Sequence, residues 1–220
     1  MKFNKDIFDS LVPAFKDKGF TYANYSSHNG GLDFFNSNTV GDHRITIDLG
    51  TTKKGFVNIY GRISFKEITQ TLQEFGELRL GIYEPIVINY DLYQNKENWT
   101  RIFKRFGSLP LKTESDIKKF EDEIIEHVEE YIIPFFNKFP DLKSVNDQIL
   151  SKLTFEEFPN YIPGNCTFKS MIIMKKFNNP RYSEYLSAKE KEYQFYVKQN
   201  AAMWQTSYNG FKKLIAFLDK

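Results

Sequence analysis

Residues 42–65 contain two stretches that alternate between apolar and polar positions. The residues that share the apolar face are His43, Ile45, Ile47 and Leu49, followed by Val57, Ile59, Gly61 and Ile63. A period of two is typical of strands with one buried face. We therefore predict a β-hairpin, with a loop that begins and ends at glycine between its two arms.

The register of this hairpin can be predicted from its polar face. A slip of one residue would turn the apolar set toward solvent, so only every second register is admissible. Shifting the favoured register by two residues would place two arginines opposite each other. The favoured register joins opposite charges and sets an arginine beside an aromatic ring. It pairs Thr46 with Asn58, Arg44 with Tyr60, Asp42 with Arg62, and His43 with Gly61 on the buried face.

The sequence before and after the hairpin predicts further helices and strands in the first half of the chain. A helix capped by Asn4 and ended by Gly19 should kink or stop early at Pro13. Strands are predicted at 20–25 and 32–36 and within 77–95. The Ser64–Glu67 pattern is that of a capping box and predicts a helix directly after the hairpin.

After residue 112 the pattern becomes helical. A long helix capped at Thr113 or Ser115 should bend or restart at Pro134. Further helices are predicted at 143–153, around Met171, from Asn179 onward, and at 201–218. The predicted fold class is α+β: an antiparallel sheet of four or five strands with flanking helices (1–112), followed by an all-helical region (113–220) packed against it.

Composition and charge exclude several classes of protein. A net charge of +2 over 220 residues is small for a dedicated nucleic-acid binder. One cysteine excludes an internal disulfide and fits a reducing compartment. The N-terminus lacks the apolar run of a signal peptide, and no stretch is apolar enough to span a membrane. We expect a soluble cytoplasmic protein with no membrane partner and no nucleic-acid ligand.

Residues with catalytic or ligand-binding chemistry are scattered. The three histidines, His28, His43 and His127, belong to no ligand-spaced cluster, and Cys166 lies in no recognisable nucleophile motif. We predict no metal, no cofactor and no catalytic residue. The basic, aromatic segment at 99–106 could stack on nucleic acid through Arg101, Lys104 and Arg105. An amphipathic turn with inward-facing aromatic rings is the simpler interpretation.

The polar face of the hairpin is the best candidate site. Its residues are Asp42, Arg44, Asp48, Asn58, Tyr60 and Arg62. An antiparallel sheet often has one face that is simply solvated. Two arginines, two acids and a tyrosine could instead recognise a carboxylate, a phosphate or a protein surface. We expect the double substitution Arg44→Ala/Arg62→Ala to spare folding and to abolish partner binding.

Three motifs in the first 150 residues carry a family resemblance. A helix ending in KDKGF, a strand ending in GRISF, and the segment DEIIEHVEEYIIPFFNKFPDL together resemble the bacterial family called domain of unknown function 4304, over residues 5–150. The resemblance implies a small cytosolic α+β protein and transfers no catalytic residue. The tail at 167–219 resembles helix-hairpin interaction modules.

These observations favour a soluble bacterial protein that binds a partner without catalysis. Immunity-like or antitoxin-like inhibition is one version of this function. The alternative is a small-molecule-binding protein or a carboxylate-dependent, hydrolase-type enzyme. That enzyme would use acids of the sheet such as Asp33, Asp42 or Asp48. A deep pocket with two carboxylates of shifted pKa would favour the enzyme.

Overall fold

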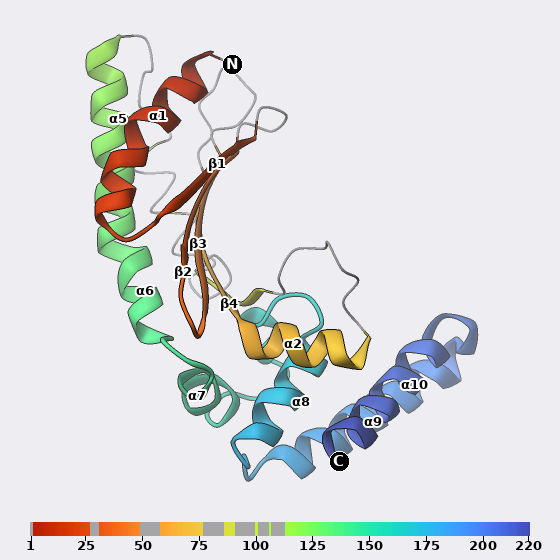
Figure 1. Ribbon diagram of the computed structural model, residues 1–220. Helices are drawn as coiled ribbons and strands as arrows, with labels where there is room; N and C mark the ends of the chain where they lie inside the picture. The colour runs from red at the N-terminus through yellow and green to blue at the C-terminus, as the bar shows by residue number, and fades with distance from the viewer. Residues whose placement is uncertain are drawn as a thin grey trace. The chain divides into compact units, whose positions relative to one another are not determined.

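A computed structural model describes residues 2–26, 31–48, 58–76, 86–90, 100, 106 and 113–220. They form an α+β fold in which an N-terminal five-stranded antiparallel sheet precedes a helical C-terminal region, as the sequence predicts (Figure 1). The described residues divide into two compact units, 1–64 with 88–140 and 65–87 with 141–220. The predicted boundary was at residue 112, where the pattern becomes helical. The helices at 114–138 belong instead to the unit that holds the sheet.

The strands follow one another in the sheet in chain order. They are β1 (Tyr22–Ser26), β2 (Gly31–Ser37), β3 (Gly41–Asp48), β4 (Asn58–Phe65) and β5 (Ile86–Asn89). Strands β1 and β2 pair in the register that sets Asn24 opposite Asp33, and β2 and β3 pair with Asp33 opposite Thr46. This pairing brings alternate residues of three strands into rows on one face of the sheet.

The helices of the first unit cover the other face of the sheet. They are α1 (Lys2–Asp17), α5 (Glu114–His127), the π-helical turn η1 (Val128–Ile132) and α6 (Ile133–Lys138) (Figure 1). The ring of Phe15 on α1 stacks on Phe34 of β2, with 4.1 Å between their centroids. His43 stacks on Phe136 of α6 at 4.5 Å. A Cβ at Gly61 would lie 3.1 Å from Phe136. His43 and Gly61 therefore both face the core, as the alternation predicted.

The two prolines in the helices of the first unit act differently from one another. Helix α1 continues through Pro13 to Asp17, so the expected early end is wrong. Gly19, in the left-handed region with φ 88°, lies in the turn that follows it. Before Pro134 the chain makes one π-helical turn, in which the amide of Ile133 donates to the carbonyl of Val128. This wider turn is the local irregularity expected where proline cannot donate a hydrogen bond.

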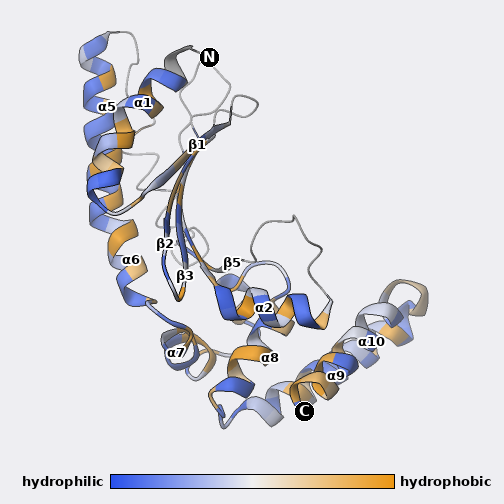
Figure 2. Ribbon diagram, in the orientation of Figure 1, coloured by the Kyte–Doolittle hydropathy of each residue, from blue (hydrophilic) through white to orange (hydrophobic). Residues whose placement is uncertain are grey.

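The second unit is helical. Its elements are α2 (Lys66–Phe75), α7 (Leu142–Val145), η2 (Asn146–Leu150), η3 (Phe158–Asn160), α8 (Cys166–Lys176), α9 (Tyr182–Gln199) and α10 (Ala201–Leu218). Helix α8 is the centre of this unit, because α2, α7, η2, α9 and α10 all pack on it. Its middle is apolar (orange in Figure 2), and residues 168–174 are buried. Among the described residues we find no helix that is both long and apolar enough to cross a membrane.

Of the predicted helix caps, Thr113 is confirmed at the start of α5, and Asn4 and Ser64 are wrong. Helix α1 begins at Lys2, so Asn4 lies inside it. Ser64 still belongs to β4, so α2 begins after Phe65 without a side-chain cap. Asn179 Oδ1 accepts from the amide of Arg181 in the turn that leads into α9, and its side-chain amide donates to Asn146 and to Ser151.

Candidate functional site: the polar face of the sheet

The polar face is built from rows of directly opposed residues on β1, β2 and β3. One row is Tyr22, Phe35 and Arg44; the next is Asn24, Asp33 and Thr46. Opposed residues of an antiparallel pair point to the same face, so these six side chains share one surface. Strand β4 borders β3 and adds Asn58, Tyr60 and Arg62 by the same alternation.

Arg44 and Asp33 form a two-pronged ion pair at the centre of this face. The Arg44 Nε donates to Asp33 Oδ1 at 2.9 Å, and Nη2 donates to Oδ2 at 2.7 Å. The Thr46 hydroxyl also donates to Asp33 Oδ1, at 2.6 Å. Asp33 and Thr46 are only 8% and 6% exposed. A carboxylate this buried requires such partners, because the protein has removed its hydration.

Aromatic rings extend the ion pair toward β1. The guanidinium of Arg44 lies over the ring of Phe35, 5.1 Å from its centroid. Phe35 in turn contacts the ring of Tyr22 at 5.4 Å. Tyr22 is 61% exposed, although its ring is anchored on one side. The face thus ends on β1 with a partly fixed, solvent-exposed tyrosine.

A second polar cluster joins β3 to β4. The hydroxyl of Tyr60 donates to the carboxylate of Asp48. The guanidinium of Arg62 lies over the Tyr60 ring at 4.8 Å. Burial raises the pKa of Asp48, and the charge of Asp33 acts in the same direction, whereas Arg62 and Arg44 oppose the rise. This half-buried carboxylate therefore holds its proton to a higher pH than an exposed aspartate does.

The Tyr60–Asp48 contact disagrees with the predicted register. That register placed Tyr60 opposite Arg44, which is four residues from Asp48 along β3. Four residues of a strand span about 13 Å, more than the two side chains can bridge. The prediction considered only the pairing of β3 with β4. It left out β2, whose Asp33 forms an ion pair with Arg44, the residue that the prediction placed opposite Tyr60.

The six predicted site residues all lie on β3 or β4. Four of them, Arg44, Asp48, Tyr60 and Arg62, belong to the two clusters described above. Asp42 is half-buried and lies opposite Ser37 of β2. The Oδ1 atom of Asn58 is buried and accepts no hydrogen bond within the described ranges. The sequence reasoning missed Tyr22 and Phe35 and gave Asp33 no place on this face, although alternation within β1 and β2 could have revealed all three.

The other candidate chemistries remain separate from this face. His43 and His127 each pack against aromatic rings, and His28 lies outside the described residues. Cys166 begins α8, where burial raises the pKa of its thiol, which disfavours a reactive thiolate. Of the segment at 99–106, Phe106 is buried against Phe120, as inward-facing aromatics would be; its three basic residues lie outside the described ranges.

Within the described ranges, no group of three or more His, Cys, Asp or Glu side chains is placed to hold a metal ion. Comparison of the chain with protein-family models, with curated proteins and with solved structures finds no significant match.

Proposed function

We propose that this is a non-catalytic, cytoplasmic protein of bacterial type that recognises a protein partner through the polar face of its sheet. Inhibition of the partner, as by an immunity protein or an antitoxin, is one version of this role. The observation that carries the proposal is the fixed arrangement of arginine and aromatic side chains. Arg44 lies between Asp33 and Phe35, and Arg62 lies over Tyr60.

This arrangement suits protein recognition for two reasons. Tyrosine and arginine are the residues that most often dominate binding energy at interfaces. Side chains that are already fixed by neighbours lose little conformational entropy when a partner binds. Tyr22 offers an exposed ring at one end of the face, and Arg62 offers a half-buried guanidinium at β4.

The test is affinity capture of the tagged full chain from a lysate of its own source cell, followed by mass spectrometry. The variant is Tyr22→Ala/Arg62→Ala, which leaves the Arg44–Asp33 pair intact. The control is Phe195→Ala, because Phe195 is 57% exposed, close to the 61% of Tyr22, and lies in the other unit. We expect one stoichiometric protein that wild type and control retain and the double variant loses. A protein retained by all three chains, or by none, would contradict the proposal.

A second candidate function is favoured by the raised pKa of Asp48. A half-buried carboxylate beside Tyr60 is a group that could exchange a proton with a small ligand. This function would be small-molecule binding or carboxylate-dependent catalysis of the hydrolase type. A metabolite screen by thermal shift, repeated with Asp48→Asn, separates the two functions. A ligand that stabilises wild type but not Asp48→Asn would favour this alternative.

A further inference from the structure

The C-terminal helices α9 and α10 form a hairpin whose aromatic rings face inward. The two helices pack on each other and are joined at Asn200, whose side chain caps α10. The rings of Tyr196 and Trp204 stack at 4.8 Å between centroids, and those of Tyr193 and Tyr208 stack at 6.1 Å. The stacked rings account for the close packing of two helices that carry few aliphatic residues.

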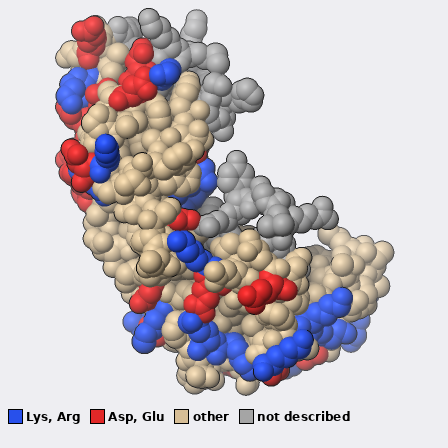
Figure 3. Space-filling view, viewed as in Figure 1, with Lys and Arg blue, Asp and Glu red and all other residues tan. Residues whose placement is uncertain are grey.

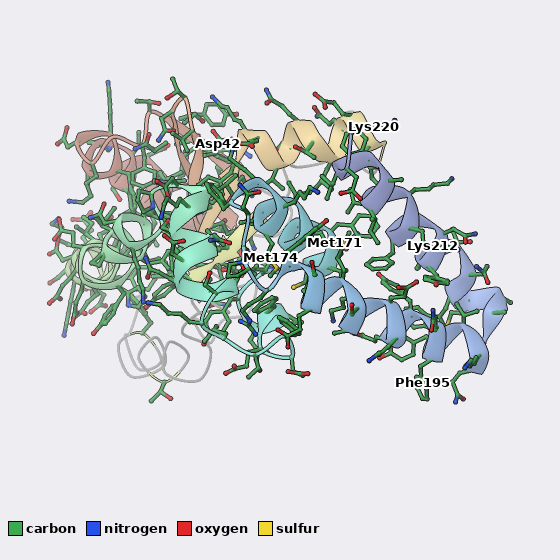
Figure 4. The ribbon with its side chains drawn as sticks, turned by 90° about the horizontal axis from the view of Figure 1, so that it is seen from below. Asp42, Met171, Met174, Phe195, Lys212 and Lys220 are labelled. Atoms are coloured by element: carbon green, nitrogen blue, oxygen red, sulfur yellow. The ribbon has the colours of Figure 1, made fainter. Side chains whose placement is uncertain are left out.

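Two large apolar side chains remain outside this packing, close to the connection. Phe195 is 57% exposed and Met203 is 66% exposed. They lie five residues before and three residues after Asn200, so both belong to the same end of the hairpin. Figure 4 shows Phe195 extending away from the helices. We call residues 193–209 the hairpin end.

Lysines outnumber acids along the hairpin. Residues 189–213 contain five lysines, Lys189, Lys191, Lys198, Lys212 and Lys213, and two acids, Glu190 and Glu192. Glu192 pairs with Lys189, and Glu190 accepts from the hydroxyl of Tyr208, over whose ring Lys212 lies. Lys198, Lys212 and Lys213 are exposed, and Figure 3 shows blue side chains with some red along the hairpin and an uncharged surface (tan) at its end. The hairpin therefore carries a net positive charge, with Lys198 within its end.

We propose that the hairpin end docks onto an acidic protein surface, with Phe195 and Met203 as its apolar anchors. The lysines would attract such a partner, and the two anchors would supply the buried contact. This surface belongs to the second unit and is separate from the polar sheet face, so the protein would carry two binding surfaces. The inference does not depend on the proposed function of the sheet.

The same observations disfavour the two other anionic partners, a lipid bilayer and a nucleic acid. A helix that lies on a membrane buries a continuous apolar face in the lipid. Here the rings of both helices are turned toward each other, and the exposed positions of α10 include Gln205, Thr206 and Asn209. Single-stranded nucleic acid stacks on free aromatic faces. The stacks of Tyr196 on Trp204 and of Tyr193 on Tyr208 already use the faces of four rings, and the exposed ring of Phe195 alone offers no series of platforms for successive bases.

The test measures the affinity of the full chain for four labelled probes by fluorescence anisotropy or co-flotation. The probes are a designed helical peptide of leucine and glutamate, the same peptide with lysine for glutamate, phosphatidylglycerol vesicles, and oligothymidylate. We expect the acidic peptide to bind, with an affinity that falls as salt rises. The lysine peptide, the vesicles and the oligonucleotide should not bind the hairpin.

Matched variants locate the binding. Phe195→Ser/Met203→Ser should weaken binding of the acidic peptide by about tenfold or more, the usual scale for loss of interface anchors. Lys198→Glu/Lys212→Glu/Lys213→Glu should abolish it. Two controls should bind as wild type does. The first is Val40→Ser, an exposed apolar side chain of the first unit outside both proposed surfaces; the second is Lys16→Glu/Lys119→Glu/Lys152→Glu, three exposed lysines elsewhere.

The outcomes that overturn the inference are distinct from those that overturn the sheet proposal. Failure of the acidic peptide to bind, equal binding of the lysine peptide, or preferential binding of vesicles or oligonucleotide would each refute docking on an acidic protein. Equal loss in the hairpin variants and their controls would refute the hairpin as the location. None of these results depends on whether Tyr22 and Arg62 are needed for partner capture from lysate.

Discussion

The polar sheet face and the hairpin end use charge in opposite ways. On the sheet, Arg44 is bound to a buried carboxylate and Arg62 lies over a tyrosine ring. On the hairpin, Lys198 and Lys213 are exposed and have no acidic residue near them in the sequence. The arginines of the sheet are therefore part of the folded structure, whereas Lys198 and Lys213 act mainly on what approaches from outside.

This difference decides what a substitution can reveal. Removing one partner of a buried ion pair leaves the other charge without compensation, and that cost appears in the free energy of unfolding. Removing an exposed charge alters mainly long-range attraction and hardly changes stability. The expectation that Arg44→Ala/Arg62→Ala would spare folding overlooked the Asp33–Arg44 pair. Loss of binding in that variant would be confounded with loss of stability.

Arg44→Ala should show the largest effect on stability. It leaves the carboxylate of Asp33 buried, with Thr46 as its remaining described donor, and should cost about 2–4 kcal/mol in the free energy of unfolding. Urea denaturation measures this cost. Lys118→Ala is the control, because Lys118 forms an exposed ion pair with Asp122 and its loss should not shift the denaturation midpoint. Equal effects in the two variants would show that the Asp33–Arg44 pair is not structural.

Gly61→Ala should show the next largest effect, on the opposite face of the same sheet. The added Cβ would lie 2.7 Å from Cγ2 of Ile132 and 3.1 Å from Cε1 of Phe136, both on the covering helix. Such overpacking costs about 1–3 kcal/mol. Combining it with Ile132→Ala removes the crowded Cγ2 contact, so the double variant should lose less stability than the sum of the two single variants. A double variant that loses as much as that sum, or more, would show that Gly61 and Ile132 are not in contact.

His43 should give the smallest effect, as a dependence of stability on pH. Burial lowers its pKa below the usual 6.5, against the opposing charge of Asp42. The folded state then binds the proton less readily than the unfolded state, so stability is lost as pH falls through 6.5 toward the lower folded pKa. Wild type should lose stability relative to His43→Gln between about pH 7 and pH 5. Parallel stability curves for the two proteins over that range would contradict a half-buried His43 that folding favours in its neutral form.

Local patterns in the sequence predicted the elements better than they predicted the contacts. Alternation located β3 and β4 and placed His43 and Gly61 on the core side, because burial of one face imposes a period of two. The pairing of Arg44 with Asp33 joins strands whose register no local signal specifies. The same limit applies to Asn179, whose place before a helix the sequence predicts but whose bond to Asn146, 33 residues earlier, it does not.

The central claim, recognition of a protein by the polar sheet face, is tested most directly by titration calorimetry with the captured partner. The three chains to compare are wild type, Tyr22→Ala/Arg62→Ala and Phe195→Ser, each first shown to unfold at the wild-type temperature. We predict that the double variant binds at least about tenfold more weakly, whereas Phe195→Ser binds that partner as wild type does. Unchanged affinity in the stably folded double variant would show that the partner does not bind this face.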